Sequence, residues 1–158
     1  MTRKKIIKTT LITISVLIVI GIGTALYLFN MPHRDVQNTK SDYFLSANEI
    51  VEEYLKDKDA ANIKYLDAEG ESKILEVKGV VAKIDTDFNG QKVVLLQSND
   101  SPAGVSCTFP IDFIEETPIT LGQTLTIKGV IRSGAEYNED LDMYENVLLD
   151  KCSLINNK

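Results

Sequence analysis

The chain has 158 residues, of which 25% are charged, and its 23 acidic and 17 basic residues leave a formal net charge of −6. A net negative charge is unfavourable for a surface that binds the phosphates of nucleic acid. The only histidine is His33. The composition therefore excludes a Ser-His-Asp or Cys-His site within the predicted folded domain, and also a zinc site with several histidines.

Residues 11–29 form an uncharged apolar run, LITISVLIVIGIGTALYLF, which is long enough to cross a bilayer as a single helix. The tail before it, residues 1–10, contains the basic residues Arg3, Lys4, Lys5 and Lys8. Because basic flanks stay in the cytoplasm, we expect a single-pass protein of the cell membrane with a cytoplasmic N-terminus and an extracytoplasmic C-terminal domain. A cleaved secretory signal is the alternative, although residues 24–30 offer no small-x-small cleavage site.

Residues 30–45 contain a proline, mixed charges and little apolar material, and they are predicted to be a juxtamembrane linker. Ser46 then begins an amphipathic helix, because Glu49 three residues later completes a capping box. The apolar positions of this helix recur at spacings of three and four, which predicts a buried face. They are Ala47, Ile50, Val51, Tyr54 and Leu55, and the same stripe along the helix is prolonged by Lys58, Ala61 and Tyr65. Gly70 is predicted to end the helix.

After Gly70 the pattern changes to an alternation of apolar and polar residues, which is typical of strands. Five strands are predicted, at residues 75–84, 92–97, 104–111, 125–131 and 147–155. Asn89 and Gly90 are expected to supply the positive φ angles of a tight turn between the first two strands. Residues 112–116, between the third and fourth strands, are predicted to form one capped helical turn.

Gly79 and Gly129 occupy the same place in two similar strand segments, VKGVV and IKGVI. A glycine inside a strand weakens it unless the glycine permits a bulge or a sharp bend, and such bends suit a small closed barrel. Five short strands with a helical link after the third have the order of the OB fold, with an open antiparallel meander as the alternative. We therefore predict a mainly β domain, residues 46–158, in which an amphipathic helix precedes a five-stranded OB-type barrel.

Four segments of this domain carry a family resemblance. They are LEVKGVV at 75–81, GVSCTF at 104–109, LGQTLTIKG at 121–129 and DKCSL at 150–154. Together with Glu49, Tyr54, Ala61 and Tyr65, they resemble the tRNA_anti-like family of bacterial OB-fold proteins, over roughly residues 46–155 with the anchor outside. The resemblance implies the architecture of that family, and function has to be argued from a site. The barrel strands bring few basic residues and no exposed aromatic pair, so we expect no nucleic-acid partner.

Asp85, Asp87, Asn89 and Gly90 spell D-x-D-x-N-G, the first half of an EF-hand calcium loop. The twelfth position of that loop, where a bidentate glutamate belongs, is Leu96 in an apolar strand. A hairpin turn explains the same residues, so we predict neither a bound metal nor a cofactor.

Residues 136–145 are the densest acidic stretch and lie between the fourth and fifth predicted strands. In OB folds this loop flanks the usual ligand-binding face. A site for a cation or a basic partner is one interpretation, and a solvated loop is the other. The candidate ligand residues in the loop are Glu136, Asn138, Glu139, Asp140, Asp142 and Glu145.

Cys107 and Cys152 lie on the predicted third and fifth strands, which are neighbours where an OB barrel closes. Two outcomes stay open, a structural disulfide, which an exported domain permits, and a pair of buried thiols. A metal site would need further ligands that the sequence lacks, and a redox pair would favour closer spacing.

These features predict a membrane-anchored, non-catalytic OB-fold binding module that is displayed outside the cytoplasm. Its expected partners are the membrane, through the N-terminal helix, and a protein or envelope component. Binding of nucleic acid or oligosaccharide by the barrel is the alternative function. An enzyme is not expected, because no nucleophile and base occur at a recognisable spacing.

Overall fold

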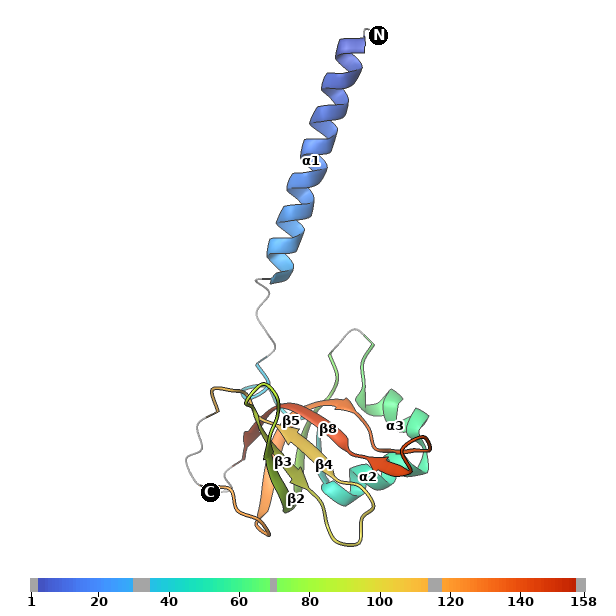
Figure 1. Ribbon diagram of the computed structural model, residues 1–158, viewed down its shortest axis with the longest axis vertical. Coiled ribbons are helices and arrows are strands. Elements are labelled where there is room, and N and C mark those ends of the chain that lie inside the picture. The colour runs from blue at the N-terminus through green and yellow to red at the C-terminus, as the bar shows by residue number, and fades with distance from the viewer. Residues whose placement is uncertain (1–2, 30–34, 69–70, 114–117, 156–158) are drawn as a thin grey trace. The chain divides into compact units, whose positions relative to one another are not determined.

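The structure is a computed structural model that describes residues 3–29, 35–68, 71–113 and 118–155. The chain divides into two compact units, Met1–Arg34 and Asp35–Lys158 (Figure 1). Helix α1, Arg3–Phe29, makes up the first unit, and its side chains are described over residues 12–27, all of them exposed. Within the described part of the chain, no helix meets the length and hydropathy needed to span a membrane.

The second unit is built on five strands that close into a barrel. They are β2 (Ile74–Thr86), β3 (Lys92–Leu96), β4 (Val105–Thr108), β5 (Thr124–Ser133) and β8 (Val147–Leu154). The pairing order is β2-β3-β4-β8-β5, and β5 pairs back to β2. The β4–β8 pair is parallel and the other four pairs are antiparallel. The closed five-stranded barrel predicted from the sequence is confirmed, with strand boundaries that move by up to three residues.

Three short strands lie outside the barrel, and the sequence patterns do not predict them. β1 (Tyr43–Ser46) pairs in parallel with β2, whereas β6 (Glu136–Asn138) and β7 (Met143–Glu145) form a separate two-stranded sheet. Strands of three or four residues are too short to show a clear alternation, so their partners decide whether they form. The predicted acidic loop at residues 136–145 is therefore a β-hairpin.

The folded unit begins at Asp35, earlier than the boundary at residue 46 that the sequence predicts. Val36 is buried against Ile74 and Val130. The Lys128 ammonium donates hydrogen bonds to the carbonyl oxygens of Gln37, at 3.1 Å, and of Thr39. Residues 35–45 are thus part of the folded unit, and the remainder of the predicted linker, residues 30–34, lies outside the described residues.

The amphipathic segment forms two helices, α2 (Ala47–Lys56) and α3 (Lys58–Tyr65), so the prediction of one continuous helix is wrong. The capping box is confirmed, because Glu49 N donates to Ser46 Oγ at 3.2 Å and Ser46 N donates to Glu49 Oε2 at 2.6 Å. The break lies at Asp57, which has a φ of −156°. Its N–H closes α2 on Glu53 O, and its carboxylate accepts from Ala60 N at 3.0 Å to begin α3.

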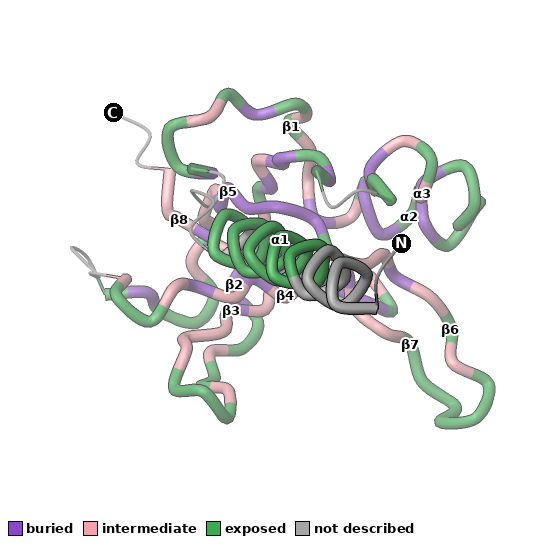
Figure 2. The backbone as a smooth tube through the Cα atoms, turned by 90° about the horizontal axis from the view of Figure 1, so that it is seen from above, coloured by how far each residue is buried: buried purple, intermediate pink, exposed green. Residues whose placement is uncertain are grey.

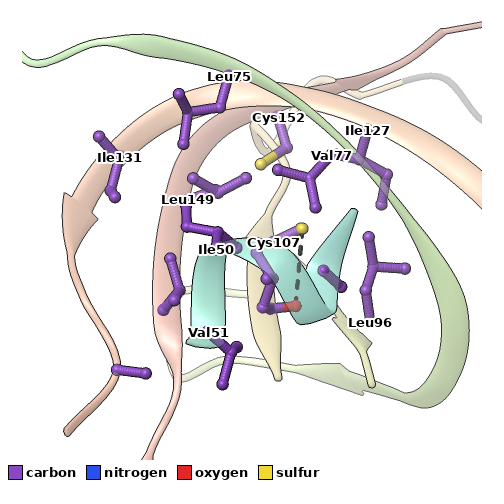
Figure 3. Packing of buried hydrophobic residues seen from close by; sticks show 14 of the residues in the cluster. Ile50, Val51, Leu75, Val77, Leu96, Cys107, Ile127, Ile131, Leu149 and Cys152 are labelled. Atoms are coloured by element: carbon purple, nitrogen blue, oxygen red, sulfur yellow. Dashed lines mark hydrogen bonds between the residues drawn. The ribbon is translucent and has the colours of Figure 1, made fainter. Parts of the chain in front are cut away.

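The core lies between α2 and the inner face of the barrel. Ile50, Val51 and Tyr54 of α2 are at most 1% exposed and pack among buried strand residues such as Val77 and Leu96. Figure 3 shows Ile50 and Val51 among the side chains of the barrel strands, and Figure 2 shows buried stretches on both the helices and the barrel strands. Burying each large apolar side chain contributes about 1.5–3 kcal/mol, so the helix is part of the barrel's stability.

Close packing explains the two mid-strand glycines. A Cβ on Gly79 would lie 2.9 Å from Leu96 Cβ, and one on Gly129 would lie 2.7 Å from Cys152 Sγ. The β5–β8 register shifts between Lys128 and Val130, so the predicted irregularity falls at Gly129. Gly79 instead pairs regularly with Leu125. Because Gly79 has no side chain, Leu96 of β3 and Ala47 of α2 can pack close to its backbone.

The turn between β2 and β3 has a single residue with positive φ, Gly90 at +80°. Asp87 N donates to Gln91 O at 2.9 Å and Gly90 N donates to Asp87 O at 3.1 Å. This is a type I turn followed by a left-handed glycine, a common hairpin loop in which the residue before the glycine keeps negative φ. The expectation that Asn89 also adopts positive φ is therefore wrong. The helical turn predicted at residues 112–116 lies largely outside the described residues.

Candidate binding face

An open cleft of about 160 Å³ lies on the outer surface of the barrel, across β2, β3 and β4. We call this surface the binding face. Its lining residues are Lys83, Asp85, Val93, Leu95, Ser106 and Asn146. In OB folds the same region of the barrel is the usual place for a ligand.

Strand alternation places most of these side chains. On β3, Val94 and Leu96 are fully buried, so Val93 and Leu95 point outward. On β4 the burial of Val105 and Cys107 leaves Ser106 on the outer side. The apolar centre of the binding face thus follows from the same alternation that builds the core.

A β-bulge in β2 brings the charged residues to this face. Val81 pairs with Leu96 and Lys83 pairs with Leu95, so two steps along β2 match one step along β3. The extra residue reverses the alternation after Val81, which is buried. Lys83 and Asp85 consequently lie beside Leu95 and Val93 on the outer face. Without the bulge, the lysine would share the inward side with Val81.

The two charges on the binding face are paired with each other. Lys83 Nζ lies 2.8 Å from Asp85 Oδ2. This hydrogen bond, together with one from Thr86 N at 2.8 Å, lowers the pKa of the Asp85 carboxyl below its usual value. The face therefore combines an apolar centre with a largely compensated ion pair.

Asn146, which directly follows β7, lines one border of the cleft. Its Oδ1 accepts a hydrogen bond from Gly104 N at 2.8 Å, and Val147 N donates to Gly104 O at 3.0 Å. A Cβ on Gly104 would lie 2.6 Å from Leu96 O, so glycine lets the start of β4 press against β3. These contacts hold one border of the cleft.

Asp85, Asp87 and Asn89 are the weak metal candidates of the D-x-D-x-N-G sequence, and the two carboxylates among them have partners within the hairpin. Asp85 pairs with Lys83, and Asp87 Oδ1 accepts from the N–H groups of Asn89 and Gln91, each at 2.8 Å. These contacts engage both carboxylates within the hairpin. In the described parts of the chain, no three His, Cys, Asp or Glu side chains gather as a metal site would require.

The acidic candidates of residues 136–145 are brought together by the β6–β7 hairpin. Glu136 pairs with Lys58, and Asn138 Nδ2 donates to Glu145 Oε1 at 2.7 Å. The Tyr137 hydroxyl donates to Asp142, and Asn138 Oδ1 accepts from the N–H groups of the turn, those of Asp140 and Leu141. Glu139 and Asp140 are exposed at the tip.

Tyr137 and Tyr144 form an aromatic pair that the sequence analysis missed. They face each other in the β6–β7 register, with ring centroids 5.0 Å apart and ring planes at 56°. Both side chains remain exposed, at 45% and 39%. The Y-x₆-Y spacing around a short turn was the available signal, and the density of acidic residues obscured it.

Cys107 and Cys152 lie on β4 and β8, which are neighbours as predicted. Both are free thiols, fully buried on the inner side of the barrel (Figure 3). Burial raises the pKa of the Cys152 thiol well above its ordinary value, and its hydrogen bond with Cys107 acts in the same direction. The thiols contribute to the core, and the disulfide stays a prediction.

A closed five-stranded barrel of OB type with a cleft on its outer face is the architecture of a binding module. The model of the tRNA_anti-like family matches residues 1–141, which is most of the chain, so the chain belongs to that family. The match includes α1, which the resemblance had left outside, and ends before β8. No curated protein and no solved structure matches the chain significantly.

Proposed function

We propose that this chain is a membrane-anchored, non-catalytic module that displays its barrel outside the cytoplasm and binds a protein or envelope component through the binding face. The cleft across β2, β3 and β4 carries the proposal, because an apolar centre is bordered there by polar and charged side chains. Its volume of about 160 Å³ is below that of typical small-molecule pockets. It suits a single large side chain of a partner.

The chemistry of the binding face favours this function over nucleic-acid binding and catalysis. Lys83 is the one basic residue among those lining the cleft, and its charge is paired with Asp85. Little counterion release is therefore available for a phosphate backbone. Ser106 is the lining hydroxyl, and the one carboxylate among the lining residues, Asp85, is paired with Lys83.

The anchoring proposal is supported by the N-terminal unit. The apolar run of residues 11–29 has the length of a membrane-spanning helix, and it lies within α1. Within α1 the structure describes the side chains of residues 12–27, which is a shorter stretch than the apolar run of residues 11–29. Their exposed apolar surface is what a bilayer would cover. The basic residues before the run favour a cytoplasmic N-terminus.

A photo-cross-linking residue at Leu95 in the full-length chain, expressed in its native cell, tests the proposal. We expect a discrete adduct from Leu95 and none from Ile63, a matched position on α3 that is 85% exposed. Ser106→Trp, which fills the cleft, should abolish the adduct.

The composition of the adduct decides between the functions. A protein or envelope component supports the proposal, whereas nucleic acid or a soluble oligosaccharide supports the alternative. Equal adducts from Leu95 and Ile63, or no adduct from Leu95, would contradict binding at this face.

A further inference from the structure

The β6–β7 hairpin presents an aromatic face that has no partner strand. The two strands pair only with each other among the described residues, and Figure 2 shows their connecting turn as an exposed projection. Tyr137 and Tyr144 are directly opposite each other, so their rings share one side of this small sheet. Glu136, Glu145, Asn138 and Met143 take the other side.

The hydroxyl of Tyr137 orients this pair by donating to Asp142 within the turn. Cross-strand packing of the rings stabilises the hairpin, and this would be a sufficient structural role if the rings were covered. They are not, since 45% of Tyr137 and 39% of Tyr144 stay accessible to solvent. Leu141 in the turn, exposed at 64%, adds further apolar surface.

The charged side chains of the hairpin segment itself all have the same sign. Residues 136–145 hold five acidic side chains and no basic one. Three of these carboxylates have partners, namely Lys58, Tyr137 and Asn138. Glu139 and Asp140 at the tip are exposed to solvent. Any ligand of the rings must therefore approach through a negative potential.

We propose that the β6–β7 hairpin docks a basic polypeptide segment through arginine or lysine side chains. A cation is attracted to the face of a tyrosine ring, and arginine also forms strong hydrogen bonds with carboxylates. The exposed Leu141 can cover the aliphatic stem of such a side chain. The acidic surroundings repel phosphate groups. This inference rests on the proposed function in treating the chain as a binding module, but it concerns a second surface.

Fluorescence anisotropy with a labelled peptide of alternating arginine and glycine tests the inference on the full-length chain in non-ionic detergent. We expect saturable binding that weakens as salt rises from about 20 to about 200 mM, because exposed charges are screened. Tyr137→Ala combined with Tyr144→Ala should weaken binding about tenfold. A peptide of alternating glutamate and glycine should not bind.

Matched variants separate the rings from the fold and from the general charge. Tyr137→Phe with Tyr144→Phe keeps the rings, so binding should stay within about threefold of the parent. Glu139→Gln with Asp140→Asn should weaken binding several-fold and flatten its salt dependence. Glu52→Gln with Glu71→Gln removes the same charge from exposed sites elsewhere and should have little effect.

Three results would overturn the inference. They are an absence of saturable binding at low salt, equal binding by the double alanine and double phenylalanine variants, and equal losses from the two charge-removing pairs. Ser106→Trp blocks the cleft and should leave peptide binding unchanged. If Leu95 gives no adduct while the peptide still binds, the proposed use of the cleft fails and the hairpin site stands.

Discussion

Tyr54 is a buried residue whose hydroxyl oxygen has no hydrogen-bond partner within the described residues. Its ring stacks on Tyr65 at 6.0 Å and covers Gly134, where a Cβ would lie only 1.9 Å from a ring carbon. The ring thus fills the space between α2 and the start of the hairpin segment. Its buried hydroxyl is an uncompensated cost, and desolvation raises the pKa of Tyr54 to about 12.

Tyr54→Phe should stabilise the protein at neutral pH. The ring contacts remain, and the removal of an unsatisfied buried hydroxyl is expected to gain about 1 kcal/mol. Denaturation by urea measures the difference in unfolding free energy. A loss of 1 kcal/mol or more would show that the hydroxyl has a favourable partner.

The same substitution should reduce the loss of stability at alkaline pH. An unfolded tyrosine ionises near pH 10.0, whereas folded Tyr54 ionises near pH 12. The unfolded state therefore loses the proton first, so this contribution is complete below pH 10.0 and is lost as the pH rises to about 12. The parent should lose roughly 2–3 kcal/mol more than Tyr54→Phe across that window. Tyr144→Phe, an exposed ring, should behave like the parent.

Gly129→Ala should destabilise the barrel by about 1–3 kcal/mol, because the new Cβ has no room. It would lie 2.7 Å from Cys152 Sγ and 3.1 Å from Asp150 O. Cys152→Ala removes the nearer atom, so the double variant should lose less than the sum of the two single losses. Thermal unfolding of the four proteins measures this coupling. Strict additivity would show that β5 and β8 separate to accept the methyl group.

The break between α2 and α3 is the clearest case in which one side chain ends one element and begins another. Asp57 accepts from Ala60 N, while its own N–H completes α2. The break lets α3 change direction, so that Tyr65 packs against Tyr43 of β1, with ring centroids 5.2 Å apart. Lys64 joins Glu53 of α2 by an ion pair of 2.8 Å across the same junction.

Asp57→Ala should therefore cost about 1 kcal/mol of stability, the usual loss for an N-cap residue. Asp57→Asn retains an oxygen that can accept from Ala60 N and should stay within a few tenths of a kcal/mol of the parent. Chemical denaturation followed by circular dichroism compares the two. Equal losses would point to the charge of Asp57, and equal stability of all three proteins would mean that the cap is dispensable.

For the whole molecule, the proposed topology predicts where the C-terminus lies. A reporter fused after the last residue of the full-length chain should be active only outside the cytoplasm, because the basic residues precede the apolar run. Replacing Arg3, Lys4, Lys5 and Lys8 with glutamine should weaken that preference. Reporter activity in the cytoplasm of the unaltered chain would refute the proposed display, and a mature N-terminus near residue 31 would identify a cleaved signal.

The sequence predicts the strands that carry the binding face, but it does not predict which side chains meet there. Alternation along residues 104–111 separates Ser106 from Val105 and Cys107, whereas the apolar run of residues 92–97 does not show which of its side chains face outward. The arrival of Lys83 and Asp85 at the binding face depends on the bulge after Val81, which exists only through pairing with β3. The tyrosine pair likewise needs the β6–β7 register, because the Y-x₆-Y spacing brings the rings together only in that pairing.

Consecutive residues encode periodicity, caps and turns, and those signals were enough for the capping box at Ser46, the five barrel strands and their OB order. Their physical basis is local, because a buried face repeats every two residues in a strand and every three or four in a helix. Tertiary contacts alone decided the burial of Val36, the short strand β1 and the β2 bulge. Each depends on groups distant in the chain, whose packing and hydrogen bonds outweigh weak local preferences.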